Sequence, residues 1–168
     1  MLGAEDNIVL VGMPGAGKST AGVLLAKELS RGFIDTDVRI QSAEGRRLQD
    51  IIDQDGMDAF LELEEHHVKN LNVRGYVVAT GGSVIYSDRA MSRLKRGGFV
   101  VYMHIGLCAL RERLGDYGAR GVVMAPGVTL ADLHAEREPL YRRWADATVD
   151  AAAAGHDDVV RSIIRALP

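Results

Sequence analysis

The chain has 168 residues, a length typical of a single domain. Its apolar share of 47% is sufficient for one hydrophobic core, and its formal net charge of −3 provides no basic surface of the kind that binds nucleic acid. No apolar run approaches the roughly 18 residues that a membrane-spanning helix needs, and no signal peptide precedes residue 8. We therefore expect one cytoplasmic domain without a nucleic-acid or membrane partner.

The chain contains one cysteine, Cys108, which excludes an internal disulfide and fits a reducing compartment. Because cysteine is commonly buried, we predict that Cys108 is a packed core thiol rather than a reactive one. The five histidines are scattered, and the adjacent His66 and His67 would point about 100° apart on a helix. The sequence therefore contains no zinc-binding pattern.

An apolar run from Ile8 to Val11 leads directly into a glycine-rich loop. The glycines at 12 and 17, with Lys18 and Ser19, match G-x-x-x-x-G-K-[ST], the phosphate-binding P-loop. Such a loop turns its backbone N–H groups toward a polyphosphate and ends at a helix N-terminus, which favours an anion. We expect Lys18 to reach the β- and γ-phosphates and Ser19 to offer its hydroxyl to Mg²⁺. The predicted nucleotide site comprises Gly12, Gly15, Ala16, Gly17, Lys18, Ser19 and Thr20. The alternative is a plain glycine-rich turn, but the strand before the loop and the helix after it are the context that nucleotide binding requires.

Apolar periodicity predicts the remaining elements. Helices are expected at 19–30, at 38–56 in two pieces, at 57–72, 88–96 and 107–114, and after Thr129 and Asp157 as capping residues. Strands are expected at 33–34, 76–80, 99–103 and 147–150. Pro139 is expected to bend or break the helix that contains it. Because strands alternate with helices throughout, the fold class is α/β, a parallel sandwich.

The strand at 33–34 is followed by Asp35-Thr36-Asp37. In open parallel sheets, ligands bind at the carboxyl ends of strands. Two acids two residues apart on an extended chain point the same way, so one can hold Mg²⁺ through water while the other accepts a proton from a substrate hydroxyl. The alternative is that these residues only cap the next helix.

Two later loops are also candidates for binding. Gly81-Gly82-Ser83 follows the strand at 76–80, and its glycines either let a ligand approach the backbone or form an ordinary turn. The glycine-rich segment 115–121 is either a mobile lid that places Arg120 over the transferring phosphoryl group or a surface loop.

Together these residues resemble the shikimate kinases, small P-loop kinases of the aromatic amino-acid pathway. The matching stretches are Gly12 to Thr20, Phe33 to Asp37, Ala79 to Gly82, Arg120, Arg137 to Tyr141, and Ala145-Asp146. The resemblance covers nearly the whole chain. It implies a three-layer α/β/α sandwich of the P-loop NTPase type with a five-stranded parallel sheet. It also implies one domain, 1–168, with a substrate-binding helical segment at about 38–72 and a lid at about 115–126.

The activity that this resemblance implies is transfer of the ATP γ-phosphoryl group to the 3-hydroxyl of shikimate, with ATP and Mg²⁺ as cofactors. We expect a monomer. Asp37 matches the acid that contacts the substrate hydroxyls and serves as base, and Asp35 matches the acid near Mg²⁺. Gly81 and Gly82 match the substrate-facing glycines, and Arg120 matches the lid arginine. Arg113 matches the arginine that lies against adenine, and Arg137 matches the arginine that grips the substrate carboxylate. The implied catalytic set is Lys18, Asp37 and Arg120.

Three positions depart from the family pattern. The family has Phe-Arg ahead of a glutamate, and that arginine is a second anchor for the substrate carboxylate; here Leu61 stands in its place. The third glycine of the family's Gly-Gly-Gly loop is Ser83, and the lid's Arg-Pro-Leu-Leu is replaced by residues 120–123, Arg-Gly-Val-Val. Loss of one charge-assisted pair costs about 1.5–3 kcal/mol, or one to two decades of affinity. The nucleotide half is therefore intact while the acceptor half is altered.

Two alternatives remain open. One is a kinase for another small hydroxylated metabolite, such as gluconate or homoserine, on the same scaffold. The other is a nucleotide-binding regulatory relative without strong catalysis. The sequence argues against this second alternative because it retains Lys18, Asp37, Arg120 and Arg137. A GTPase switch is disfavoured because the sequence has no Asn-Lys-x-Asp motif.

Overall fold

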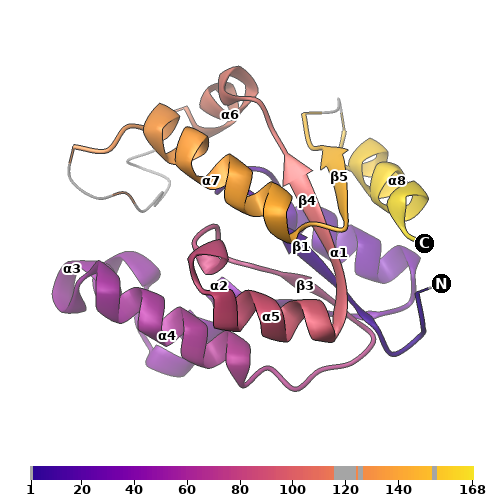
Figure 1. Ribbon diagram of the computed structural model, residues 1–168, viewed down its shortest axis with the longest axis horizontal. Helices are drawn as coiled ribbons and strands as arrows, with labels where there is room; N and C mark the ends of the chain where they lie inside the picture. The colour runs from indigo at the N-terminus through magenta and orange to yellow at the C-terminus, as the bar shows by residue number, and fades with distance from the viewer. Residues whose placement is uncertain (1, 116–123, 125–126, 153–154) are drawn as a thin grey trace.

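The computed structural model describes residues 2–115, 124, 127–152 and 155–168 (Figure 1). Five parallel strands form one sheet in the order β2-β3-β1-β4-β5. The strands are β1 (Asn7–Val11), β2 (Gly32–Asp35), β3 (Tyr76–Ala79), β4 (Gly98–His104) and β5 (Ala147–Asp150). The predicted five-stranded parallel sheet is confirmed.

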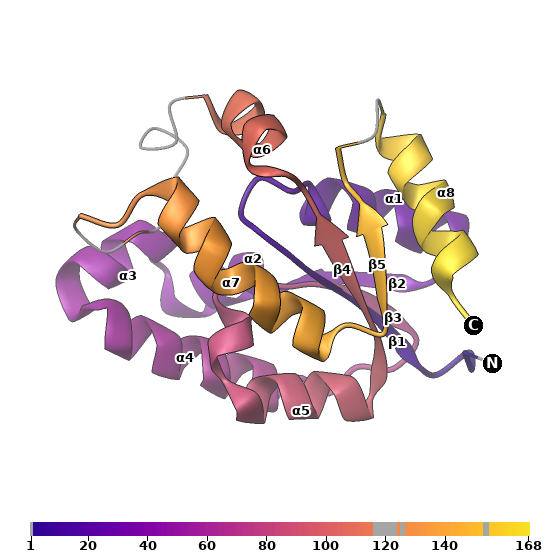
Figure 2. The same cartoon turned by 45° about the horizontal axis from the view of Figure 1, so that its top comes forward.

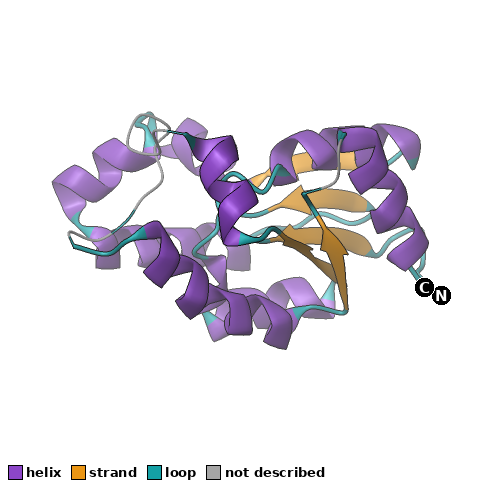
Figure 3. Cartoon of the chain, turned by 90° about the horizontal axis from the view of Figure 1, so that it is seen from above, coloured by secondary structure: helices purple, strands orange, loops and turns teal. Residues whose placement is uncertain are grey.

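Helices cover both faces of this sheet (Figures 1 and 3). On one face, α1 (Lys18–Glu28) packs against α8 (His156–Ala166), and on the other lie α5 (Asp88–Arg96) and α7 (Leu130–Trp144). A short helix, α6 (Leu107–Leu114), follows β4, and a 3₁₀ turn, η1 (Val84–Tyr86), follows β3. This arrangement confirms the three-layer sandwich. None of the helices described is long and apolar enough to cross a bilayer.

The central strand explains why the sheet needs two covering layers. Every residue of β1 is buried, and Ile8 to Val11 are fully inaccessible to solvent. A strand buried on both faces reads as a continuous apolar run instead of an alternating one. The apolar runs of β3 and β4, which flank β1, have the same origin.

Three helices stand beyond the carboxyl end of β2 and form a separate group (Figures 1 and 2). They are α2 (Thr36–Glu44), α3 (Leu48–Asp55) and α4 (Met57–Lys69). Ile40, Ile51 and Phe60 form a small core between them, against which Leu61 packs. The helical character of segment 38–72 is confirmed, and its role in substrate binding stays a prediction.

Helical periodicity in the sequence predicts an apolar stripe of Met57, Leu61, Val68 and Leu71 along the helix at 57–72, and the buried face of α4 differs from it. The residues that are buried along it are Phe60, Glu64 and Val68. These positions are four residues apart and therefore share one face of the helix. Relative to the predicted stripe, the buried face is rotated by about one residue, and Leu61 packs against the small core that α4 shares with α2 and α3. A carboxylate consequently lies in the middle of the buried face.

Two local predictions are wrong. Cys108 is exposed, because α6 turns Leu110 and Leu114 inward and leaves Cys108 on the outer side. The last helix is capped by Gly155, and Asp157 lies within its first turn, where a negative charge still favours the helix dipole.

Pro139 does not break α7, which continues from Leu130 to Trp144. A proline removes one backbone donor from a helix. Here a capping box between Thr129 and Asp132 satisfies the first turn, and buried Leu133 and Tyr141 hold the helix against the core, so the helix persists. The capping role predicted for Thr129 is confirmed.

Candidate active site

The loop between β1 and α1 has a backbone that only glycine adopts readily. Gly12, Gly15 and Gly17 have φ values of 150°, 83° and 91°. A Cβ at Gly12 would lie 2.7 Å from the carbonyl oxygen of Met103, and a Cβ at Gly15 would lie 2.6 Å from Leu114 Cδ2. Gly17 caps α1 without a side-chain hydrogen bond. The first N–H groups of α1 are therefore left for an anion, as the P-loop pattern predicts.

Lys18 is buried and folded back onto this loop. Its Nζ donates hydrogen bonds to the carbonyl oxygens of Gly12 and Met13, both at 2.8 Å. Burial lowers the pKa of Lys18 to about 8, and the nearby carboxylates of Asp37 and Asp35 oppose this shift. An ammonium group has three protons, so one remains for a phosphate oxygen.

Asp35 caps α2, as one of the two predictions for it states, and its role near Mg²⁺ stays a prediction. Its Oδ1 accepts hydrogen bonds from the backbone N–H groups of Asp37 and Val38, so it caps α2. Its Oδ2 accepts a hydrogen bond of 2.5 Å from the hydroxyl of Ser19 at the start of α1. The expectation that Asp35 and Asp37 lie on one extended chain is wrong, because α2 begins at Thr36. The helix nevertheless leaves both carboxylates near Lys18.

Ser19 and Asp35 fit a magnesium ion better than a transition metal. A hydroxyl and a carboxylate are hard oxygen ligands of the kind that Mg²⁺ prefers. Within the described part of the chain, no three His, Cys, Asp or Glu side chains cluster as a metal cage. Mg²⁺ does not need one, because it is usually held by one or two protein oxygens together with phosphate oxygens and water.

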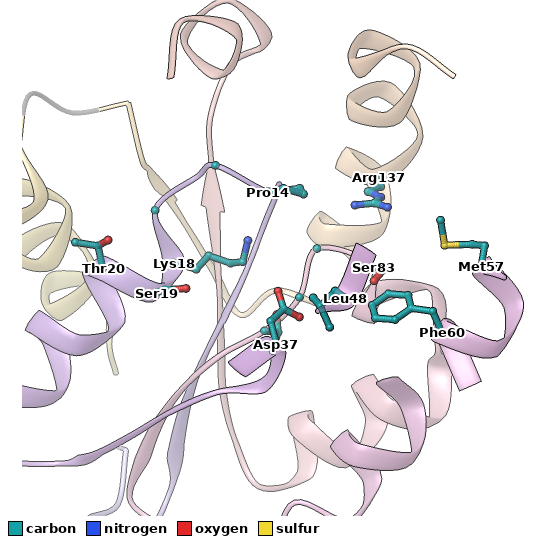
Figure 4. A pocket seen from close by; sticks show the side chains of 15 residues that line it. Pro14, Lys18, Ser19, Thr20, Asp37, Leu48, Met57, Phe60, Ser83 and Arg137 are labelled. Atoms are coloured by element: carbon teal, nitrogen blue, oxygen red, sulfur yellow. The ribbon is translucent and has the colours of Figure 1, made fainter. Parts of the chain in front are cut away.

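A pocket of about 380 Å³ opens between the P-loop, the α2–α4 group and α7 (Figure 4). Lys18, Ser19 and Asp37 line its phosphate end, and Ser83 and Arg137 line the side toward α7. A third wall, formed by α3 and α4, is apolar and consists of Leu48, Met57 and Phe60. Leu61 does not line this pocket and packs instead against the small core of the α2–α4 group.

The loop after β3 needs its glycines because other groups approach it closely. A Cβ at Gly81 would lie 2.4 Å from Oε1 of Glu64, and one at Gly82 would lie 2.8 Å from Cδ of Pro14. The Gly81 N–H donates to Thr36 Oγ1 at 3.1 Å, and the Tyr141 hydroxyl donates to the carbonyl oxygen of Gly82 at 2.6 Å. These two hydrogen bonds therefore hold the loop between α2 and α7, at the border of the pocket. An ordinary turn does not need such contacts with two helices.

Two buried carboxylates face this loop. Burial and the neighbouring charge of Asp35 raise the pKa of Asp37 to about 6. Burial raises the pKa of Glu64 to about 7, and a hydrogen bond of 2.7 Å from the Ser83 hydroxyl partly opposes that shift. Oδ1 of Asp37 and Oε1 of Glu64 have no hydrogen-bond partner among the described residues. Asp37 lines the pocket, whereas Glu64 is buried behind the loop and is linked to the pocket through Ser83.

Arg137 brings a positive charge to the same pocket. Only 5% of the residue is exposed, and its Nε donates to the Tyr86 hydroxyl at 3.1 Å. The guanidinium lies 5.2 Å from the centre of the Tyr86 ring, which is a neutral partner. No carboxylate of the described residues pairs with Arg137, so its charge can serve an anionic group of a ligand.

Two predicted arginines stand apart from this arrangement. Arg113 donates to the carbonyl oxygens of Ala16 at 3.2 Å and Ala151 at 2.5 Å, which places it against the P-loop. Its contact with adenine stays a prediction. Arg120 and most of the predicted lid lie outside the described residues.

Sequence reasoning missed several residues of the site: Glu64, Tyr86, Tyr141, and the apolar side chains Leu48, Met57 and Phe60. Glu64 carried a usable signal, because it lies four residues from both Phe60 and Val68 on an otherwise apolar face. A charged residue at the centre of such a face is rarely buried without a function or a partner. The tyrosines carried no comparable signal.

The sheet order, the P-loop and the acids beside it define a P-loop kinase. The family model for shikimate kinase matches residues 14–168. The chain is 38% identical over 164 residues to the shikimate kinase of Pseudomonas aeruginosa strain LESB58, covering 96% of this chain and 95% of that protein. The chain belongs to the shikimate kinase family, a family of ATP-dependent small-molecule kinases.

Solved structures agree with this assignment. A shikimate kinase from Acinetobacter baumannii in complex with shikimate has a TM-score of 0.88 and 31% identity, covering 96% of this chain and 92% of that one. A gluconokinase from Sinorhizobium meliloti has a TM-score of 0.53 and 20% identity, covering 97% of this chain and 91% of that one. The second similarity shows the fold alone.

We predict that Lys18→Ala abolishes turnover while the protein stays folded. The substitution removes the ammonium that neutralises the β- and γ-phosphate oxygens, a contact that is strongest in the transition state. Turnover and thermal melting are measured beside Lys27→Ala, an exposed lysine at the end of the same helix. Unchanged turnover in Lys18→Ala would contradict the assignment of the P-loop.

Glu64 makes a separate prediction about stability and pH. Its pKa is raised from 4.5 to about 7, so the folded state binds the proton more tightly than the unfolded state does. Stability should therefore fall as pH rises from about 4.5 to about 7. Glu64→Gln cannot ionise, so its melting temperature should fall less between pH 5 and pH 8 than that of the wild type.

The control for this experiment is Glu65→Gln. Glu65 follows Glu64 on α4, but a hydrogen bond from Ser87 lowers its pKa. Its removal should not reduce the loss of stability toward high pH. If the melting temperatures of Glu64→Gln and the wild type fall by the same amount between pH 5 and pH 8, a costly ionisation at Glu64 is ruled out.

Proposed function

We propose that this protein transfers the γ-phosphoryl group of ATP to the 3-hydroxyl of shikimate in aromatic amino-acid biosynthesis. One observation carries the proposal: the P-loop lysine, a buried carboxylate and a buried arginine line a single pocket in a member of this family. The family supplies ATP as the donor, and the solved relative from Acinetobacter baumannii is described with shikimate bound.

The P-loop binds the triphosphate through the backbone N–H groups at the start of α1. Lys18 exchanges a contact with the loop carbonyls for one with the β- and γ-oxygens. Ser19 and Asp35 hold Mg²⁺, which neutralises charge on these oxygens when it is bound. The hydrogen bond between Ser19 and Asp35 supports this assignment, because it brings both oxygen ligands to one point beside the P-loop.

Asp37 takes the proton from the acceptor hydroxyl. It lines the pocket next to Lys18, and its pKa of about 6 leaves it ionised but still basic near neutral pH. Arg120, from the predicted lid, is proposed to stabilise the transferring group, as the family resemblance implies. The arrangement requires only positioning and charge stabilisation, which is how phosphoryl transfer is catalysed.

Arg137 holds the carboxylate of the acceptor. Its guanidinium is buried beside the loop after β3 and lies against the ring of Tyr86, which carries no charge. The apolar wall of Leu48, Met57 and Phe60 then covers the ring of the acceptor. We further propose that the protein acts as a monomer in the cytoplasm.

The proposal is tested by a coupled ATP-consumption assay over a panel of hydroxy acids and polyols that includes shikimate, gluconate and homoserine. We expect the highest kcat/KM with shikimate. A higher value with another panel member would identify a different acceptor on the same scaffold. Nucleotide binding without turnover of any member would favour a regulatory relative.

We predict that Asp37→Asn lowers kcat by about 10²–10⁴-fold, because it keeps the shape of the side chain but removes the proton acceptor. The rate is measured at saturating ATP and acceptor. Asp53→Asn, on the exposed side of α3, serves as the control. A loss of less than about threefold in Asp37→Asn would contradict the role of this residue as a base.

We predict that Leu61→Arg lowers the KM for shikimate by about one to two decades. An arginine at 61 lies one turn before Glu64 on α4, so it can pair with that carboxylate and reach the pocket as a second cation. Glu62→Arg places an arginine on the exposed side of the helix and should leave this KM unchanged. If Leu61→Arg raises an already low KM, another residue holds the carboxylate.

A further inference from the structure

The loop after β3 carries a serine whose hydroxyl is held by a buried glutamate. Ser83 lines the pocket, and its Oγ donates to Oε2 of Glu64 on α4, with 2.7 Å between the two oxygens (Figure 4 shows Ser83). A serine hydroxyl has one proton and two lone pairs. Because the proton is directed to Glu64, Oγ offers only lone pairs to a group inside the pocket.

The other oxygen of Glu64 adds a second acceptor nearby. Within the described chain, neither Oε1 of Glu64 nor Oδ1 of Asp37 has a hydrogen-bond partner, and Glu64 is only 2% exposed. A Cβ built on Gly81 would lie 2.4 Å from the first oxygen and 2.6 Å from the second. The two oxygens therefore lie within about 5 Å of each other, beside the backbone of Gly81. This close approach of both carboxylates requires a glycine at residue 81.

The neighbouring cations leave these oxygens unsatisfied. Lys18 directs two of its protons to the P-loop carbonyls, and Arg137 directs Nε to Tyr86. On the same helix, Glu65 pairs with both Lys69 and Arg89, whereas Glu64 forms no ion pair with any described residue. A buried carboxylate in this state is costly until a donor reaches it. This side of the pocket therefore favours a ligand that brings a donor.

We propose that Ser83, with its hydroxyl oriented by Glu64, forms a specificity subsite whose Oγ accepts a hydrogen bond from a donor substituent of the acceptor molecule, either a hydroxyl or an ammonium group. The substituent is next to the hydroxyl that is phosphorylated, because Asp37, the proposed base, lies within about 5 Å of the glutamate that orients Ser83. The inference rests on the proposed function, since it takes this pocket as the acceptor site of a kinase. It goes further by assigning the choice of the neighbouring substituent to these two residues.

The test compares shikimate with two analogues in which the ring hydroxyl next to the reacting one is replaced by hydrogen or by an amino group. With shikimate, we expect Ser83→Ala and Glu64→Gln each to lower kcat/KM by about 10-fold, with an unchanged KM for ATP. With the deoxy analogue, each variant should match the wild type within about twofold, because the contact is already missing. The wild type should prefer the amino analogue to the deoxy analogue by about 10-fold.

The chain supplies a matched control. Ser87 Oγ donates to Oε2 of Glu65, also at 2.7 Å, and joins α4 to the start of α5 without lining the pocket. Ser87→Ala and Glu65→Gln should leave the ratio of shikimate to deoxy-analogue activity unchanged, and thermal melting checks that all four variants fold. If Glu64→Gln does not fold, Ser83→Ala alone decides. An equal loss for shikimate and the deoxy analogue in Ser83→Ala would overturn the subsite, because it would show that the hydroxyl only holds the loop.

Failure of the proposed function has a different signature. The wild type would then phosphorylate neither shikimate nor its analogues. The same comparison is made with the acceptor that the panel identifies and its deoxy analogue. A loss confined to the intact acceptor would support the subsite while contradicting shikimate, and a uniform loss would contradict both.

Discussion

Ala79 of β3 pairs with Leu10 of β1 on one side and with Asp35 of β2 on the other, so three parallel strands end at one level. The chain leaves β1 as the P-loop, β2 as the start of α2, and β3 as the glycine loop. Thr80 extends the pairing by donating its N–H and its hydroxyl to the Leu10 carbonyl oxygen. The register of three strands thus brings segments that are up to 70 residues apart into one pocket.

The electrostatics of the pocket follow from burial. The pKa of Lys18 is lowered to about 8, and the pKa values of Asp37 and Glu64 are raised to about 6 and 7. Each shift moves the group toward its neutral form, because the protein interior solvates charge less well than water does. Titratable groups with such opposed shifts in one pocket are typical of catalytic sites. A phosphate and a hydroxyl would supply the partners that the free protein lacks.

The two halves of the site differ in what they require of the sequence. The nucleotide half depends on backbone geometry, and the positive φ angles of Gly15 and Gly17 leave little freedom for substitution. The acceptor half depends on side chains of α4, α7 and the loop after β3, which can change without altering the fold. Leu61 and Ser83 are the departures from the family in this half, and both affect Glu64. Leu61 supplies no positive charge on α4 where the family has an arginine, and Ser83 donates a hydrogen bond to the Glu64 carboxylate.

The P-loop, the strand-helix alternation and the bounds of α5, α6 and β5 were predictable, because periodicity and glycine spacing are local properties of the chain. The bond between Glu64 and Ser83 and the exposure of Cys108 were not. Each depends on which face of a helix meets a neighbour that is distant in sequence, and a rotation of about one residue on α4 was enough to exchange Leu61 for Phe60 in the pocket wall. The sequence by itself therefore determined the fold class and the phosphate site, whereas packing between distant elements decided which side chains meet the acceptor.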